Sequence, residues 1–348
     1  MATTAATMAS GLMVATGGFA PEPDFGGTQS GESRRKPQLG GVRQESDGVK
    51  SLDIAGVRLR FDFVGVRPHR AVLFHEIRWS SPLDCTPDVE WLITITPFVG
   101  EAPDSAAYSK VLHLDTAVLW MSHHPGRHAI LRLGPQLRKK EIDAALAAAL
   151  HSALRREGRL DIHAAAVSPG DEKGGVLIVG PKGHGKTSLT VAAALSGWTF
   201  LSDDVVVVWG PGESPQGTGL RTSFFLTGDT EGRLPATAPK GTANPSHDKL
   251  KQDPETLFPG QRRDVFRIRA VVYPKIADSA LSRLGRIEPS AAFKRLLSHC
   301  AFLAQDKEAR PCLDVARDLA LLPTFDLRAG RDALEPANAV RILRAALD

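Results

Sequence analysis

The chain has 348 residues, of which 42% are hydrophobic and 24% are charged, a balance typical of a soluble globular protein with one large domain or two ordinary ones. A net charge of only +4, with 6% aromatic residues and no dense block of lysine and arginine, does not indicate a nucleic-acid partner. The longest apolar runs fall short of the ~18 residues that span a bilayer, the first residues lack a basic region, and the three cysteines (Cys85, Cys300 and Cys312) are widely spaced, so we expect a cytoplasmic protein without a membrane partner.

The first part of the chain contains two kinds of sequence. Residues 1–48 are rich in Gly, Ser, Thr, Pro and charged residues and lack periodic apolar spacing, which predicts a disordered tail. Apolar runs separated by turn residues over 50–135 predict a small, mostly-β module. Its expected strands are 54–63, 91–96, 111–114 with 117–120, and 129–133.

The pattern of residues 136–348 predicts an α/β nucleotide-binding domain. An amphipathic helix is expected over 139–156, because Ile142, Leu146, Leu150 and Leu154 recur every four residues before Gly158. Beyond it, the expected strands are 160–167, 176–179, 198–201, 205–209, 266–273 and 323–327, and the expected helices are 188–195, 291–303 and 338–347. Residues 210–262 are polar and rich in proline and glycine, which predicts a long loop of functional or mobile character.

The most specific motif lies between an expected strand and an expected helix. Residues 180–187 read Gly-Pro-Lys-Gly-His-Gly-Lys-Thr, which matches the phosphate-binding pattern of Gly, four residues, Gly, Lys, then Ser or Thr. The glycines allow backbone N–H groups to face phosphate, Lys186 is expected to reach the β- and γ-phosphates, and the Thr187 hydroxyl to ligate Mg²⁺. The expected ATP-binding residues are Gly180, Gly183, His184, Gly185, Lys186, Thr187 and Ser188. A glycine-rich turn without a ligand is the alternative.

Three further side chains are candidates for the chemistry. Asp203 and Asp204 follow an expected strand that returns the chain beside the glycine loop, at the strand end where open α/β sheets build sites. One carboxylate of such a pair can bind Mg²⁺ while the other accepts a hydroxyl proton; a solvated turn is the alternative. His163 lies on the expected strand before the loop, where a packed histidine is the alternative to a catalytic one.

These segments resemble the HPr kinase/phosphorylase family. The similar stretches are Leu160-Asp-Ile-His-Ala, the loop over 180–187, and Gly197-Trp-Thr-Phe-Leu-Ser-Asp-Asp. The resemblance implies a P-loop kinase core akin to phosphoenolpyruvate carboxykinase, with ATP and Mg²⁺ as cofactors. It also implies that Asp203 is the catalytic acid/base, that Asp204 and Thr187 are metal ligands, and that His163 lies near the active site.

The motifs and the resemblance together predict an ATP-dependent kinase that phosphorylates a hydroxyl, with a serine of a peptide or protein as the expected acceptor. A nucleotide-binding switch, or an ATPase coupled to a partner, is the alternative, and a homo-oligomer is left open. Phosphoryl transfer also calls for a cation that neutralises transition-state charge. The sequence does not choose among Lys249, Arg262, Arg263, Arg267 and Arg269.

Overall fold

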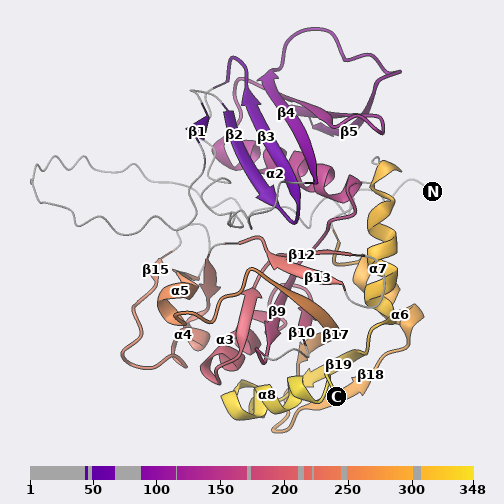
Figure 1. The fold of residues 1–348 in the computed structure, drawn as a ribbon. Helices are drawn as coiled ribbons and strands as arrows, with labels where there is room; N and C mark the ends of the chain where they lie inside the picture. The colour runs from indigo at the N-terminus through magenta and orange to yellow at the C-terminus, as the bar shows by residue number, and fades with distance from the viewer. Residues whose placement is uncertain are drawn as a thin grey trace, which may run out of the picture.

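The computed structural model describes residues 44–45, 49–66, 88–114, 116–170, 174–210, 215–221, 223–243, 249–300 and 307–348. They form a mixed α/β fold with two large sheets (Figure 1). Apart from residues 44 and 45, which form a short strand, the predicted tail over 1–48 lies outside the described residues, and so does Cys85.

The first sheet is built from the predicted β module. Its strands, in spatial order, are β1 (Gln44–Glu45), β2 (Val49–Ile54), β3 (Val57–Phe63), β4 (Val89–Pro97), β7 (His128–Leu133), β6 (Ala117–Ser122) and β5 (Tyr108–Leu114). The β3–β4 and β4–β7 pairs are parallel and the other pairs are antiparallel. Side chains on β3 and β7 alternate between buried and half-buried, so one face of this sheet packs into a core.

One predicted strand of this sheet begins too early. The strand expected over 54–63 is confirmed as β3 over 57–63, but Ala55 and Gly56, with φ angles of 52° and 78°, turn the chain between β2 and β3. Positive φ is unfavourable for most residues but costs glycine little, so the Ala-Gly pair marks a turn. The strand β2 was therefore missed, although its residue Leu52 is fully buried.

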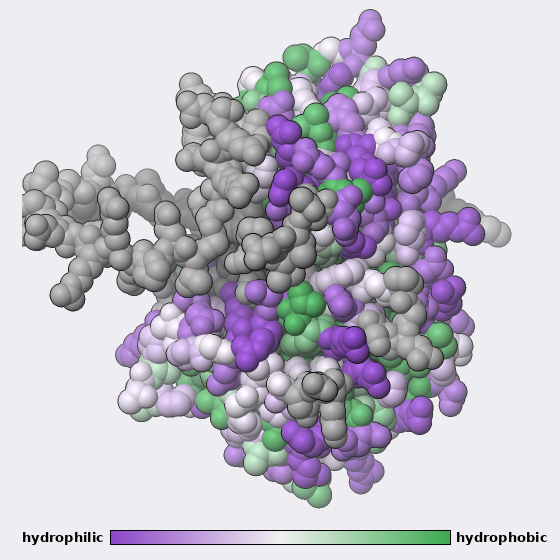
Figure 2. Space-filling model, in the orientation of Figure 1, coloured by the Kyte–Doolittle hydropathy of each residue, from purple (hydrophilic) through white to green (hydrophobic). Residues whose placement is uncertain are grey.

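Helix α2 (Lys139–Arg156) covers the buried face of the first sheet. It has the bounds that the four-residue spacing predicts. Leu146 and Leu150 are fully buried with strand residues such as Leu59 and Ile93 in one apolar core. In Figure 2 the upper part of the molecule, where this sheet lies, shows many hydrophilic side chains on its outer surface.

The second sheet belongs to the predicted α/β domain. In spatial order it contains β11 (Thr199–Ser202), β9 (Ala164–Ser168), β10 (Gly175–Val179), β17 (Val265–Ile276), β13 (Gln216–Gly219), β12 (Val206–Trp209) and β8 (Leu160–Ile162), with β19 (Thr324–Ala329) beside β17 and β18 (Arg283–Arg286) beside β19. Strands β10, β17 and β19 run parallel.

Helices cover both faces of the second sheet. Val176 and Ile178 pack in a cluster with α3 (Lys186–Leu195) and α8 (Pro336–Arg344). Leu177 and Val179 point the other way, into a cluster with α6 (Pro289–Leu297) and α7 (Pro311–Leu321). This alternation gives a three-layer α/β/α arrangement around β10, which is buried on both faces.

The long loop predicted over 210–262 is wrong. Besides β13, the described part of this stretch contains a three-stranded sheet of β14 (Phe224–Leu226), β16 (Leu250–Gln252) and β15 (Thr242–Ala243), with the short helices α4 (Gly228–Glu231) and α5 (Pro254–Leu257). These elements have two to four residues each, too short for periodicity to reveal. Helix α7 was also missed, and the helix predicted over 291–303 is α6, with residues 301–303 outside the described part.

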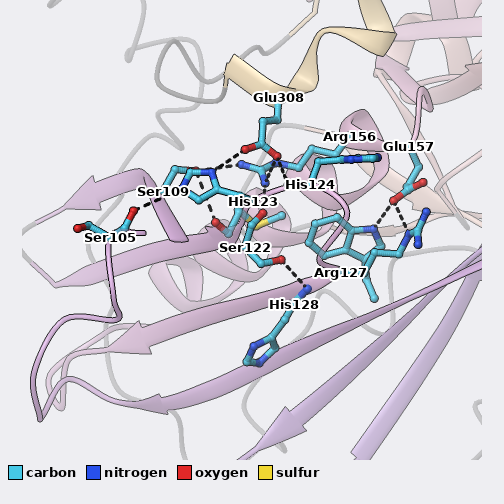
Figure 3. Close-up of polar contacts among 12 residues, drawn as sticks. Ser105, Ser109, Ser122, His123, His124, Arg127, His128, Arg156, Glu157 and Glu308 are labelled. Atoms are coloured by element: carbon cyan, nitrogen blue, oxygen red, sulfur yellow. Dashed lines mark hydrogen bonds and ion pairs between the residues drawn. The ribbon is translucent and has the colours of Figure 1, made fainter. Parts of the chain in front are cut away.

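A polar contact joins the first sheet to the C-terminal part of the chain. The Glu308 carboxylate, in the short 3-10 helix Lys307–Ala309, lies 2.8 Å from His123 Nδ1, accepts the His124 N–H and pairs with Arg156 at 3.1 Å. Figure 3 shows Glu308 between these side chains. The ion pair raises the pKa of His123 and lowers that of Glu308.

Two further observations concern membrane-spanning helices and the cysteines. Among the described helices, none is both long and apolar enough to cross a membrane. Cys300 and Cys312 are buried free thiols.

Candidate functional site

The glycine loop connects β10 to α3, in the strand–loop–helix order that the sequence predicts. Gly183 and Gly185 have φ angles of 87° and 89°, a conformation that favours glycine. Nothing lies within 4 Å of the position where a Cβ on Gly183 would be. Helix α3 begins at Lys186, two residues before the predicted start, so its positive N-terminal end faces the loop.

Lys186 folds back onto its own loop. Its Nζ lies 2.7 Å from the Gly180 carbonyl oxygen, 3.1 Å from that of Pro181 and 2.9 Å from His163 Nε2. These three acceptors match the three N–H donors of an ammonium group. Burial lowers the pKa of Lys186 to about 8, against the opposing effect of the Asp204 and Asp203 charges.

His163 interrupts the strand that the sequence predicts over 160–167. The chain there forms two strands, β8 and β9, that pair with different partners, and His163 is the residue between them. Its Nδ1 lies 2.9 Å from the Asp204 carbonyl oxygen and 3.1 Å from Asp204 Oδ1. Because Nε2 accepts a hydrogen bond from the Lys186 ammonium, Nδ1 carries the ring proton and donates a hydrogen bond to Asp204.

Asp203 is buried beside Thr187. The residue is 3% exposed, and its Oδ2 accepts a 2.9 Å hydrogen bond from Thr187 Oγ1. Its other oxygen, Oδ1, is buried and accepts no hydrogen bond from another described residue. Burial, with the neighbouring Asp204 charge, raises the pKa of Asp203 to about 7, so a cation beside it would stabilise the charged form.

Asp204 points toward other partners. Besides His163, it pairs with Arg221, whose Nε is 3.5 Å from Asp204 Oδ2. Its side chain is 33% exposed. Burial would raise the pKa of Asp204, but the hydrogen bond from His163 and the positive charges of Arg221 and Lys186 outweigh it and lower the pKa.

The remaining predicted binding residues border the loop. His184 Nδ1 lies 3.0 Å from the Pro274 carbonyl oxygen at the end of β17, and Ser188 Oγ lies 2.9 Å from Thr230 Oγ1 on α4. The short elements missed within 210–262 thus lie against the helix that begins at the loop. What these residues bind stays a prediction.

The five candidate cations lie at different distances from the aspartates. The positive charge of Lys249 opposes the net rise in the pKa of Asp203 and adds to the lowering of the pKa of Lys186, so Lys249 lies near both side chains. Arg262 donates to the Arg221 carbonyl oxygen at 2.6 Å, and Arg263 donates to backbone carbonyls. Arg267 and Arg269 are exposed near the start of β17 and lie beside Gly174, at the opposite end of β10 from the glycine loop.

Sequence reasoning missed Arg221 and His299. Arg221 lies in the stretch predicted as a loop, and no motif marks it. His299 follows α6, and burial, together with the positive charges of Lys186 and Arg295, lowers its pKa to about 4. Its carbonyl oxygen accepts the His163 N–H at 3.4 Å. The contact between His163 and His299 joins segments more than 100 residues apart, which local patterns do not reveal.

The residues present fit a nucleotide with Mg²⁺. Within the described ranges, no three His, Cys, Asp or Glu side chains gather as a metal cage. Mg²⁺ does not require one, since it commonly binds one or two carboxylates together with nucleotide phosphates and water. The unpaired Asp203 Oδ1, next to the Thr187 hydroxyl, is a polar atom that such a cation would satisfy.

Comparisons with known proteins identify no family. No protein-family model and no curated protein matches the chain. Among solved structures, the HPr(Ser) kinase/phosphatase from Coxiella burnetii aligns with a TM-score of 0.28 and 15% sequence identity, over 53% of this chain and 88% of that one. A TM-score of this size supports no inference about function, so the side chains of this chain must carry the functional conclusion.

Proposed function

We propose that the chain is an ATP-dependent kinase that transfers a phosphoryl group to a hydroxyl, with a serine of a peptide or protein as the acceptor. The observation that carries this proposal is the junction of β10 and α3. There, Lys186 lies in a glycine loop beside two carboxylates that have different partners. Phosphoryl transfer needs a phosphate cradle, a metal ligand and a group that takes the nucleophile's proton, and this junction offers one side chain or loop for each.

The residues of the loop would hold the nucleotide. Backbone N–H groups around Gly183 and Gly185, with the N-terminal end of α3, would bind phosphate oxygens. Lys186 would exchange its bonds with the Gly180 and Pro181 carbonyls for bonds with phosphate oxygens. The Thr187 hydroxyl and one carboxylate would hold Mg²⁺, which supplies positive charge to the transferring phosphoryl group.

The second carboxylate favours a kinase over the alternatives. A nucleotide-binding switch or a partner-coupled ATPase needs one acidic metal ligand, whereas here a second carboxylate is held in place by His163 and Arg221. Two adjacent carboxylates in different environments suit two different tasks. The serine acceptor is proposed from the resemblance of the motifs to the HPr kinase/phosphorylase family, because the site itself calls only for a hydroxyl.

Replacing Lys186 tests nucleotide binding. Lys186→Ala removes the buried ammonium and should weaken binding of ATP far more than binding of adenosine, as measured by isothermal titration calorimetry. Lys182→Ala is the matched control, because Lys182 is an exposed lysine of the same loop, and it should keep the affinity for ATP. Equal affinities for ATP in wild type and Lys186→Ala would contradict the proposal.

Phosphoryl transfer is tested separately. Wild-type protein, γ-labelled ATP and Mg²⁺ are incubated with a library of serine-containing peptides and with matched peptides in which alanine replaces serine. Label should enter only the serine peptides. ATP binding without labelling of any acceptor would favour the nucleotide-binding switch.

A further inference from the structure

The two aspartates after β11 lie in different surroundings although they are adjacent in sequence. Asp203 is 3% exposed and turns back toward Thr187, at 2.9 Å. Asp204 has a side chain that is 33% exposed and turns toward His163 and Arg221. The resemblance to the HPr kinase/phosphorylase family implies that Asp204 is the metal ligand beside Thr187, whereas the structure brings Asp203, not Asp204, to Thr187.

Asp203 has the features of the metal-facing carboxylate. Its Oδ2 accepts a hydrogen bond from the Thr187 hydroxyl, and its Oδ1 is buried without a hydrogen bond from another described residue. An unpaired buried carboxylate oxygen is costly, and a divalent cation beside it would remove that cost.

Asp204 has the features of the acceptor-facing carboxylate. It is the more accessible of the two, so an incoming hydroxyl can reach it, while the buried Asp203 is covered by protein. It is linked to Lys186 through His163, whose two ring nitrogens contact both side chains. His163 therefore positions Asp204 beside the residue that would bind the γ-phosphate, and its nitrogens are already occupied.

We propose that Asp204 takes the proton of the acceptor hydroxyl, that Asp203 holds the metal with Thr187, and that Arg221 positions Asp204. This division rests on the proposed kinase function. In the transfer, Asp204 accepts the proton from the acceptor oxygen while that oxygen bonds to the γ-phosphorus. The bond between this phosphorus and the oxygen bridging to the β-phosphate breaks, and ADP leaves.

Arg221 is itself held in place. Its carbonyl oxygen accepts a 2.6 Å hydrogen bond from Arg262 Nη2. The backbone of Arg262 in turn forms a β-bridge with Phe200 of β11, the strand that leads to the aspartates. The Arg221 Nε lies 3.5 Å from Asp204 Oδ2, on the opposite carboxylate oxygen from the one that faces His163. Arg221 and His163 thus hold Asp204 from two sides and keep it turned away from Thr187.

Metal-dependent nucleotide binding separates the two aspartates. ATP is titrated into wild type, Asp203→Asn and Asp204→Asn by calorimetry, once with Mg²⁺ and once with EDTA. Wild type should bind ATP more tightly with Mg²⁺ than with EDTA. Asp203→Asn should bring this ratio of affinities close to one, and Asp204→Asn should keep it. Unchanged affinity in EDTA and an unchanged melting temperature show that each variant is folded.

The opposite result overturns the division. If Asp204→Asn loses the effect of Mg²⁺ and Asp203→Asn keeps it, the assignment that the family resemblance implies is right and the kinase proposal stands. If both variants keep the wild-type ratio, neither aspartate holds the metal and the division also fails. If wild type binds no ATP, the proposed function itself fails.

Turnover tests the role of Arg221. Release of phosphate from ATP is measured with water as the acceptor. Asp204→Asn should lower kcat by the ~10²–10⁴-fold typical of losing a general base, with KM unchanged. Arg221→Gln should lower kcat by a smaller factor, also without a change in KM, and Arg221→Lys should recover part of the loss. Arg317→Gln, which removes an exposed partner of Asp314 on α7, is the control. Wild-type kcat in Arg221→Gln, or a change in KM alone, would overturn the positioning role.

Discussion

Gly219 leaves the space that the aspartate-bearing strand needs. It ends β13, and a Cβ at this position would lie 2.2 Å from the Leu201 carbonyl oxygen and 3.0 Å from Ser202 Cβ. Backbone atoms cannot yield at so short a distance, and Ser202 directly precedes Asp203. The absence of a side chain at one residue therefore sets the position of the strand end that carries both carboxylates.

Gly219→Ala should accordingly destabilise the protein by about 1–3 kcal/mol, as overpacking in a core does, and should weaken Mg²⁺-dependent ATP binding as well. Chemical denaturation and calorimetry measure the two effects. The control is Gly285→Ala, an exposed strand position with nothing within 4 Å of the added methyl group. Its stability should stay within about 0.5 kcal/mol of wild type. Equal stability of the two variants would contradict the close approach to Leu201.

For individual residues of the site, the sequence predicts which side chains lie close together but not how each side chain is oriented. Lys186, Thr187, Asp203, Asp204 and His163 are near one another in the structure, as the motifs lead one to expect. The orientation of two adjacent aspartates depends on their partners instead. His163 lies 41 positions from Asp204, between β8 and β9, and Arg221 lies in a stretch without a recognisable motif, so a local pattern does not reveal these contacts.

Among the elements, α2 and β8 are joined by a buried ion pair. Arg155 Nε lies 2.6 Å from Asp161 Oδ1, and His151 Nδ1 lies 3.2 Å from Asp161 Oδ2. Arg155 is 2% exposed and Asp161 is 7% exposed. Burial would raise the pKa of Asp161, but the positive charges of His151 and Arg155 hold it well below its ordinary range. The helix on the first sheet is thereby connected to the second sheet.

Removing this carboxylate should be costly and should depend on pH. Asp161→Asn leaves Arg155 buried without its counter-charge, which typically costs about 3–5 kcal/mol. Because the folded pKa is depressed, the contribution of Asp161 is present above its unfolded value of about 3.9 and is lost as the pH falls further. The difference in melting temperature between wild type and Asp161→Asn should therefore narrow in acid. Asp314→Asn, in an exposed pair, should show neither the loss nor the narrowing.

Element prediction succeeded where periodicity is long and failed where elements are short. The bounds of α2 follow from four turns of regular apolar spacing. By contrast, β14, β15 and β16 have two or three residues each, and their stability comes from pairing with one another rather than from their own pattern. His163 also ended a strand that its apolar neighbours alone would continue, because β8 and β9 pair with different strands.

For the whole molecule, the first sheet and α2 form one packed unit. The predicted boundary between residues 135 and 136 stays a prediction, but it would separate the sheet from the helix that covers it. Leu146 and Leu150 are fully buried in the same core as the strand residues. Among the described residues that follow α2, only a few, such as Val207 and Leu220, reach into this core. The packing therefore favours a boundary after α2.

Two fragments test where this unit ends. Residues 49–158 contain β2 to β7 and α2 and should unfold in one cooperative transition, because both sides of the core are present. Residues 49–135 lack the helix, expose the apolar face of the sheet to water, and should show no cooperative transition. Circular dichroism during heating measures both. Leu150→Asp in the longer fragment is the control, because a charge placed in this core should abolish the transition while leaving the chain length unchanged. A cooperative transition in the shorter fragment at the same temperature as in the longer one would show that the sheet is stable without α2 and that the boundary lies near residue 135.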